Sequence, residues 1–289
     1  MKFIVTCFFI SSFSLAQELH PIIAFDSLGY PTKIWMDIIY KRYNYNDSTT
    51  LNIISSTKDS SWIKNIYQAI PRWKKILPKL QKPFFNVSLS DTIYIVIGNQ
   101  LADDAFTHGN NTICFDIQQL SEYGKGESEE NKERIDRIFS HEYIHLLHKS
   151  WRKDKIIITT QWEKILLECV NEGLGNYYSL SQKWKIDTQG KIPEITKNTL
   201  KKLEPIFVEK FCFAFHHQNF DDSLFNKLSK GKFEEKWGAL PVALWLDRET
   251  HSDSQLLRQW IEKGLDGVLY LADKYLEEPY RSKLRECRK

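Results

Sequence analysis

Residues 141–145 read HEYIH, inside a segment that starts at Lys132 and whose apolar residues recur with the period of an α-helix. Residues four apart lie one turn apart on the same helix face, so the imidazoles of His141 and His145 can approach one metal ion. Glu142 is rotated away from that row, which leaves its carboxylate free to act on water as a general base. The spacing therefore predicts a helix that carries two zinc ligands, His141 and His145, and a catalytic base, Glu142.

A catalytic zinc site also needs a third protein ligand and one open coordination position. His148 lies a further turn along the same helix, where it is poorly placed to complete a tetrahedral site. Trp151 stands where the longer pattern H-E-x-x-H-x-x-G-x-x-H requires a third histidine, so that pattern is excluded. The remaining candidates lie downstream: Glu168, Glu172, His216, His217 and His251.

Glu172 lies in a second segment with helical periodicity, residues 161–180, and follows His145 by 27 residues. A carboxylate from a second helix would complete the two-histidine, one-glutamate ligand set of several catalytic zinc sites. Glu168, one turn earlier, could replace Glu172 as the ligand or hold a ligating histidine from behind. Without a metal, all of these residues would be ordinary polar groups on amphipathic helices.

Two motifs occur in residues 135–180: H-E-x-x-H, and a downstream helix that reads NEG at 171–173 before hydrophobic, small and Tyr residues. Together they resemble the gluzincin metallopeptidases and, more narrowly, small families of predicted zinc proteases that include gliding-motility-type exported proteins. Residues 237–249 are more loosely similar to a helix that packs near the site. The resemblance favours Glu172 over Glu168 as the third ligand and implies a zincin-like fold.

The same resemblance implies a function. His141, His145 and Glu172 would bind Zn²⁺, and Glu142 would activate water. The expected protein is an exported zinc-dependent peptidase that acts on a peptide or protein substrate. Substrate-binding motifs of the aminopeptidase type are missing, so the alternative is a non-catalytic binding or cell-envelope assembly protein with the same fold.

Two further features of a peptidase site have candidates in the sequence. A Tyr or His beside the metal often stabilises the tetrahedral oxyanion. The sequence does not rank the candidates for this role: Tyr177, Tyr178, Tyr280, His216 and His217. The strand predicted at residues 112–117 could be a sheet edge that pairs with an extended peptide, or simply a buried strand.

The rest of the chain predicts an α+β fold with a small mixed sheet. Residues 91–97 are rich in β-branched and aromatic side chains and predict a strand, followed by the weaker strand at 112–117. Helical spacing covers residues 60–80, where Pro71 and Pro78 are expected to kink or divide the helix. Further helices are predicted at 32–43, 161–180, 200–215, 239–250, 254–263 and 265–276.

The domain organisation follows from this order of elements. No repeat or long linker interrupts the sequence, so one zincin-like domain is expected over residues 17–289. Its sheet-containing part would extend to about residue 150, and residues 151–289 would form a helix-rich C-terminal half.

Residues 1–16 have the pattern of a secretory signal peptide. Lys2 precedes an apolar core, small residues follow at Ser14 and Ala16, and cleavage is expected before Gln17. The apolar run of about 13 residues is shorter than the roughly 20 that a membrane anchor needs. The mature protein is therefore expected to be secreted or periplasmic, with no stable membrane insertion.

Composition excludes several other classes of protein. With 42% hydrophobic and 27% charged residues, the chain is neither collagen-like nor a highly charged disordered segment. Its 40 Lys and Arg are interleaved with 37 Asp and Glu, so no nucleic-acid partner is predicted. Spacing does not decide between free thiols and any of three disulfide pairings for the four cysteines after the signal peptide, which are Cys114, Cys169, Cys212 and Cys287.

Overall fold

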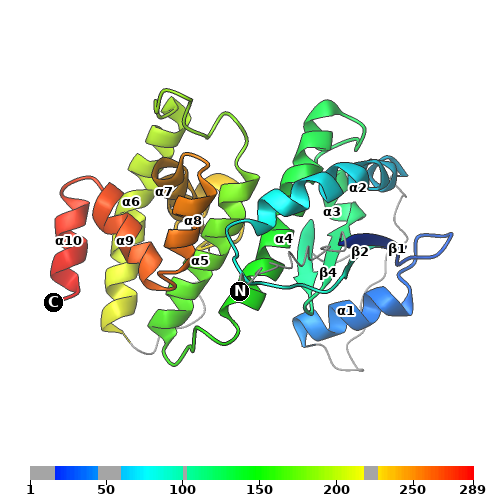
Figure 1. The fold of residues 1–289 in the computed structure, drawn as a ribbon, viewed down its shortest axis with the longest axis horizontal. Helices are drawn as coiled ribbons and strands as arrows, with labels where there is room; N and C mark the ends of the chain where they lie inside the picture. Colours follow the sequence, from blue (N-terminus) through cyan, green and yellow to red (C-terminus); the bar gives the residue numbers. More distant parts are fainter. Residues whose placement is uncertain (1–16, 45–59, 100–102, 218–226) are drawn as a thin grey trace, which may run out of the picture.

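The computed structural model describes residues 17–44, 60–99, 103–217 and 227–289 (Figure 1). The predicted signal peptide, residues 1–16, lies outside this part of the chain. The described residues form an α+β fold in which a small mixed sheet precedes a large helical portion, as the sequence predicts. None of the helices in these ranges is both long enough and apolar enough to cross a membrane.

Four strands form the sheet in the order β1-β2-β4-β3. They are β1 (Glu18–Ile23), β2 (Thr92–Gly98), β3 (Ala105–His108) and β4 (Thr112–Asp116). β1, β2 and β4 run parallel, and β3 pairs antiparallel with β4. β4 is the strand predicted at 112–117, and its suggested place at a sheet edge is wrong, because it lies between β2 and β3 with all five residues buried.

Helices cover both faces of the sheet (Figure 1). Val96 of β2 packs in a cluster with Trp35 of α1 (Lys33–Tyr43), whereas its neighbours Ile95 and Ile97 belong to the main core. That core contains buried residues of α2 (Ser60–Gln81), α3 (Ile117–Ser121) and α4 (Glu129–Arg152). The alternation follows from the period of two in a strand, which directs successive side chains to opposite faces.

Helix α2 corrects part of one expectation, the division of the helix at its prolines, because it continues unbroken from Ser60 to Gln81. Pro71 and Pro78 do not divide it. Both prolines are exposed, so water can satisfy the carbonyl groups that lose a helical hydrogen bond. On the buried face, Trp73 and its neighbours pack against the core and hold the helix together.

An aromatic stack fixes the position of α4 against α2. Trp73 of α2 stacks on Phe139 of α4, with ring centroids 4.2 Å apart and an interplanar angle of 2°. Phe139 in turn lies 5.8 Å from the ring of Tyr143. The Trp73 indole N–H also donates to Asp136 Oδ1 over 2.7 Å. The helix that carries HEYIH is therefore held against α2 by large rings.

The C-terminal half is helical, as predicted. Its elements are α5 (Gln161–Ser179), α6 (Glu194–His216), the 3₁₀ helix η2 (Phe233–Glu235), α7 (Ala239–Thr250), α8 (Ser254–Ile261), α9 (Asp266–Tyr275) and α10 (Tyr280–Cys287). α5 packs against both α4 and α7. It therefore links the helical half to the helix that carries HEYIH.

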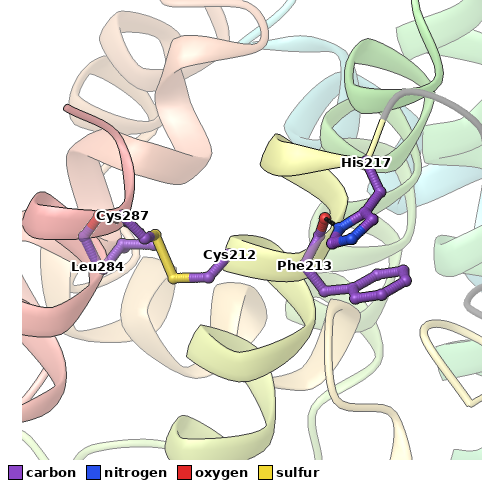
Figure 2. Close-up of a disulfide and its surroundings, with 5 residues drawn as sticks. All are labelled: Cys212, Phe213, His217, Leu284 and Cys287. Carbon is purple, nitrogen blue, oxygen red and sulfur yellow. Dashed lines mark hydrogen bonds between the residues drawn. A yellow bond between two sulfur atoms is a disulfide. The ribbon is translucent and has the colours of Figure 1, made fainter.

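A disulfide resolves part of the cysteine question. Cys212 of α6 is bonded to Cys287 of α10, which ties the last helix of the chain to the helical half (Figure 2). Cys114 and Cys169 are free thiols, and both are buried. Only the fold brings residues 75 positions apart into bonding distance, so spacing could not choose this pairing.

Candidate metal centre

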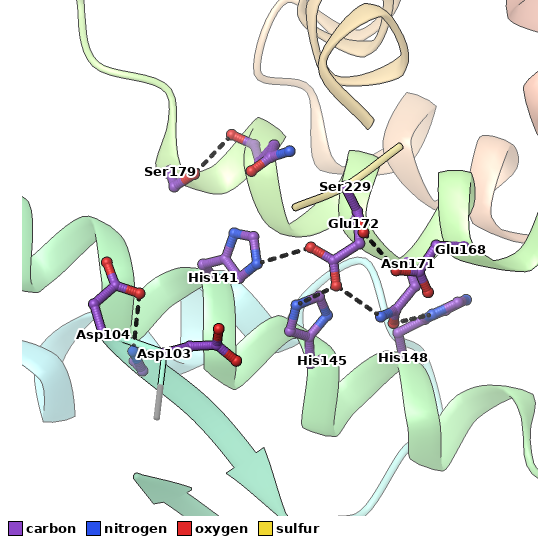
Figure 3. Close-up of polar contacts among 12 residues, drawn as sticks. Asp103, Asp104, His141, His145, His148, Glu168, Asn171, Glu172, Ser179 and Ser229 are labelled. Atoms are coloured by element: carbon purple, nitrogen blue, oxygen red, sulfur yellow. Dashed lines mark hydrogen bonds and ion pairs between the residues drawn. The ribbon is translucent and has the colours of Figure 1, made fainter. Parts of the chain in front are cut away.

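Helices α4 and α5 bring the three predicted ligands together (Figure 3). His141 Nε2 lies 3.5 Å from one Glu172 carboxylate oxygen, and His145 Nε2 lies 3.3 Å from the other. The two imidazole rings meet edge to face, with centroids 4.5 Å apart. One ligand atom from each residue lies within 4.8 Å of the others, so the group could hold a metal ion.

N-terminal caps fix where the two helices that carry this group, α4 and α5, begin. Ser128 caps α4 by accepting a hydrogen bond from Asn131 N, at 3.2 Å. α5 begins with a full capping box, in which Thr160 accepts from Glu163 N and Glu163 accepts from Thr160 N. Such caps satisfy N–H groups that the first helical turn leaves unpaired. Both ligand-bearing helices therefore start at fixed positions.

A glycine allows α5 to approach the face of α4 that carries His141. A Cβ atom at Gly175 would lie 2.7 Å from Cε1 and 2.8 Å from Nε2 of His141, closer than side chains can pack. A Cβ atom at Gly173 would meet Val242 Cγ1 of α7 at 2.5 Å. The role of neither glycine was predicted from the sequence. The available signal was the presence of two glycines inside a helical pattern, which often marks close packing.

Glu142 lies next to the ligands, on the buried side of α4, with 7% of its surface exposed. Burial raises the pKa of its carboxyl group to about 7. The charges of Glu172 and Asp104 act in the same direction, while those of His141 and Arg42 oppose it. A carboxylate with a pKa near neutrality can both accept and return a proton, as a general base must.

The protonation states of His145 and Glu172 suit metal binding. Burial lowers the pKa of His145 to about 4, so its ring is neutral near pH 7 and has a nitrogen lone pair available. Burial opposes ionisation of Glu172, but His145 and His141 outweigh it and lower the pKa of the carboxyl group to about 2. For His141, burial lowers the pKa, yet contacts with Glu172 and Glu142 produce a net increase.

Glu168 is not brought to the two histidines. Its Oε1 accepts a hydrogen bond of 2.6 Å from the hydroxyl of Ser229, and Figure 3 shows this contact behind Glu172. Burial raises the pKa of Glu168, to which the charge of Glu172 adds. The geometry therefore favours Glu172 as the third member of the group, the choice that the resemblance implied.

His148 and Asn171 form a second layer behind the group. His148 is buried, and its Nδ1 lies 3.2 Å from Asn171 Oδ1. The Asn171 amide donates to Glu172 Oε1 over 3.4 Å. Asn171 thus links α4 to the carboxylate of Glu172, a contact that the sequence analysis did not anticipate. Groups in this position orient the ligands of metal sites.

Several candidates for the oxyanion role are placed elsewhere. The Tyr177 hydroxyl is buried and bonded to Thr250 Oγ1 at 2.9 Å. Tyr280 belongs to α10, which packs on α6 and α9. His216 and His217 are exposed at the end of α6, where His217 Nδ1 lies 2.8 Å from Phe213 O (Figure 2).

Tyr178 and His251 complete the list of candidates. The ring of Tyr178 packs edge-on against Tyr177, with centroids 5.2 Å apart. His251, a distant candidate for the third ligand, is exposed at the C-terminal end of α7 and does not belong to the group of His141, His145 and Glu172.

Comparison of the chain with protein-family models, with curated proteins and with solved structures found no match.

Proposed function

We propose that the protein is a zinc-dependent peptidase that uses Glu142 as its general base. The observation that carries this proposal is the meeting of His141, His145 and Glu172 beside a buried carboxylate whose pKa is raised to about 7. Two imidazole nitrogens and one carboxylate form a ligand set of catalytic zinc. Zinc bound there would polarise a carbonyl group and lower the pKa of a water molecule.

The protein groups then have distinct roles. His145 is neutral, and Glu172 is ionised, so both can bind the cation without a change in protonation. Glu142 takes a proton from the attacking water and returns it to the amine that leaves. Asn171 holds the Glu172 carboxylate in place through its amide hydrogen bond.

The sheet edge supports a peptide as substrate. β3 is the outer strand on the side of β4, and it packs against α4. Its other edge pairs with no strand among the described residues, so an extended peptide could add to it by main-chain hydrogen bonds. In this proposal β3, and not the strand at residues 112–117, is the sheet edge that pairs with an extended peptide.

Metal analysis and a peptide-library digestion test the proposal together. The protein, purified without added metal, should contain close to one equivalent of zinc and should cleave library peptides. Glu142→Gln should keep the zinc and lose hydrolysis, because Gln cannot accept the proton. Full activity in Glu142→Gln would refute the assigned base. Zinc without any cleavage would favour the non-catalytic binding protein instead.

Export of the protein is part of the same proposal. It rests on residues 1–16, which carry the signal-peptide pattern. Protein secreted into the periplasm or the medium should begin at Gln17, and mass spectrometry of the intact chain would show this. A chain that retains Met1 would contradict cleavage at that site.

A further inference from the structure

Tyr143 lies on the side of α4 opposite the two candidate histidine ligands. Successive residues of an α-helix are rotated by about 100°, so Tyr143 is about 180° away from the mean direction of His141 and His145. Its side chain is fully buried, and its ring lies 5.8 Å from that of Phe139. The tyrosine within HEYIH therefore packs on the back of the helix, while the histidines occupy the front.

Two glutamine side chains hold the Tyr143 hydroxyl. The hydroxyl donates to Gln17 Oε1 over 2.6 Å and accepts from Gln81 Nε2 over 2.6 Å. Gln81 Nε2 also lies 3.5 Å from Gln17 Oε1, which closes a triangle of three polar groups. A phenolic hydroxyl can both donate and accept, and both functions are used here.

The two glutamines come from different segments of the sheet-containing half. Gln81 is the last residue of α2, and Gln17 directly precedes β1. Gln17 Nε2 donates to Ser90 O over 2.6 Å, and Glu18 N donates to Asp91 O over 2.8 Å. The amide group of Gln17 therefore links the segment before β2 to the back of α4.

Rotation of α4 about its own axis is the movement that these contacts oppose. Side chains extend about 5 to 6 Å from a helix axis, so a rotation of about 10° would move a histidine nitrogen by about 1 Å. Metal–ligand distances tolerate only about 0.2 Å. Hydrogen bonds restrain such a rotation because they weaken steeply with distance and angle, whereas apolar contacts have no preferred direction.

The ligand contacts on the front of α4 cannot replace this restraint. His141 and His145 contact the Glu172 carboxylate at 3.5 and 3.3 Å, and a metal bound between them would take the place of these contacts. The hydrogen bonds on the back of the helix do not depend on the metal. They can therefore orient the histidines before a metal binds.

We infer that Gln17 is a positioning residue of the metal centre, which acts through the Tyr143 hydroxyl to hold the two histidines of α4 toward Glu172. The inference rests on the proposed zinc site and adds to it a residue 126 positions away from Tyr143 in the sequence. Gln17 acts from the opposite side of the helix, so its effect is on the orientation of the ligands.

Competition with a chromophoric chelator measures zinc affinity, and the visible spectrum of bound Co²⁺ reports the geometry of the site. Gln17→Met keeps the length of the side chain but loses its amide, and Tyr143→Phe loses only the hydroxyl. Each should weaken zinc binding about 10-fold, equivalent to about 1.4 kcal/mol, and shift the Co²⁺ bands. The double variant should bind zinc no more weakly than Tyr143→Phe, because both changes remove the same contact.

Ile66→Val is the matched control, because it removes one methyl group from the buried face of α2 and no hydrogen bond. Loss of a buried methyl group and loss of a hydrogen bond lower stability to a similar extent. Urea unfolding of the metal-free proteins should show this loss, while zinc affinity in Ile66→Val stays that of the parent. An equal loss of zinc affinity in Ile66→Val and Gln17→Met would reveal a general effect of stability and overturn the inference.

The remaining outcomes separate the role of Gln17 from the proposed function. Parent zinc affinity and an unchanged Co²⁺ spectrum in Gln17→Met, or additive losses in the double variant, would overturn the inference and leave the peptidase proposal standing. Weaker zinc binding in Gln17→Met, without cleavage of library peptides by the wild-type chain, would support the positioning role and count against the peptidase function. A wild-type chain that binds no zinc would overturn both.

Discussion

Gly175→Ala should weaken zinc binding while leaving the fold intact. The added methyl carbon would lie 2.7 Å from Cε1 and 2.8 Å from Nε2 of His141, whereas ordinary contacts begin at 3.4 Å. The imidazole must therefore move by about 0.7 Å or α5 must retreat from α4. Either movement displaces a ligand nitrogen by more than the roughly 0.2 Å that metal–ligand distances tolerate.

The expected magnitude follows from that displacement. A ligand held in the wrong orientation costs about 10- to 100-fold in metal affinity, or about 1.4 to 2.7 kcal/mol. Stability of the metal-free fold should change little, because Ala in place of Gly favours a helix by about 1 kcal/mol and offsets part of the clash. Gly175→Ala thus separates metal affinity from folding.

Competition with a chromophoric chelator measures zinc affinity, and thermal unfolding of the metal-free proteins measures stability. Gly173→Ala is the matched control, since its methyl group would press on Val242 of α7 at 2.5 Å instead of on His141. Such overpacking costs about 1 to 3 kcal/mol, so this variant should lose stability first. Wild-type zinc affinity in Gly175→Ala would refute the assigned packing at His141.

Further changes test other parts of the structure. Glu172→Gln should abolish stoichiometric zinc binding, whereas Glu168→Gln should retain it, as elemental analysis of both variants would show. Burial raises the pKa of Glu204 to about 7, so the stability it contributes is full below about pH 4.5 and is lost as the pH rises to about 7. Glu204→Gln should flatten urea-derived stability over that range, by at most about 3 kcal/mol, and an unchanged profile would contradict this. Replacing Cys212 and Cys287 by Ser should lower the free energy of unfolding by about 4 kcal/mol in urea titrations, and a loss below 1 kcal/mol would show that the bond is dispensable.

Periodicity predicted the long helices well, because each buries one apolar face, and side-chain caps also mark where α4 and α5 begin. Periodicity did not predict strands β1 and β3, whose alternating patterns are interrupted or short. β1 contains Pro21, which is tolerated because the strand lies at the sheet edge. β3 has only four residues, too few for an alternating pattern to stand out. Because β3 was not predicted, β4 was considered as a possible sheet edge, whereas it lies between β2 and β3.

In the candidate site, too, features within one helix could be predicted from the sequence, and contacts between helices could not. The spacing of His141 and His145 is a property of one helix and can be read directly. The choice of Glu172 depended on a resemblance, because helical spacing alone does not say which face of α5 meets α4. The role of Gly175 depends on the approach of α5 to α4, which no local pattern encodes.

The burial of Glu142 supports the proposal that the site serves catalysis. An apolar residue at that position would avoid the cost of removing a carboxyl group from water, which is the cause of its raised pKa. His141 and Glu172 can be explained structurally by their mutual contact. For Glu142, the charges of His141 and Arg42 favour ionisation, but burial and the charges of Glu172 and Asp104 outweigh them. A buried carboxylate with a raised pKa, one residue from a candidate ligand histidine, is a candidate proton acceptor near neutral pH. The proposed peptidase mechanism needs such a group.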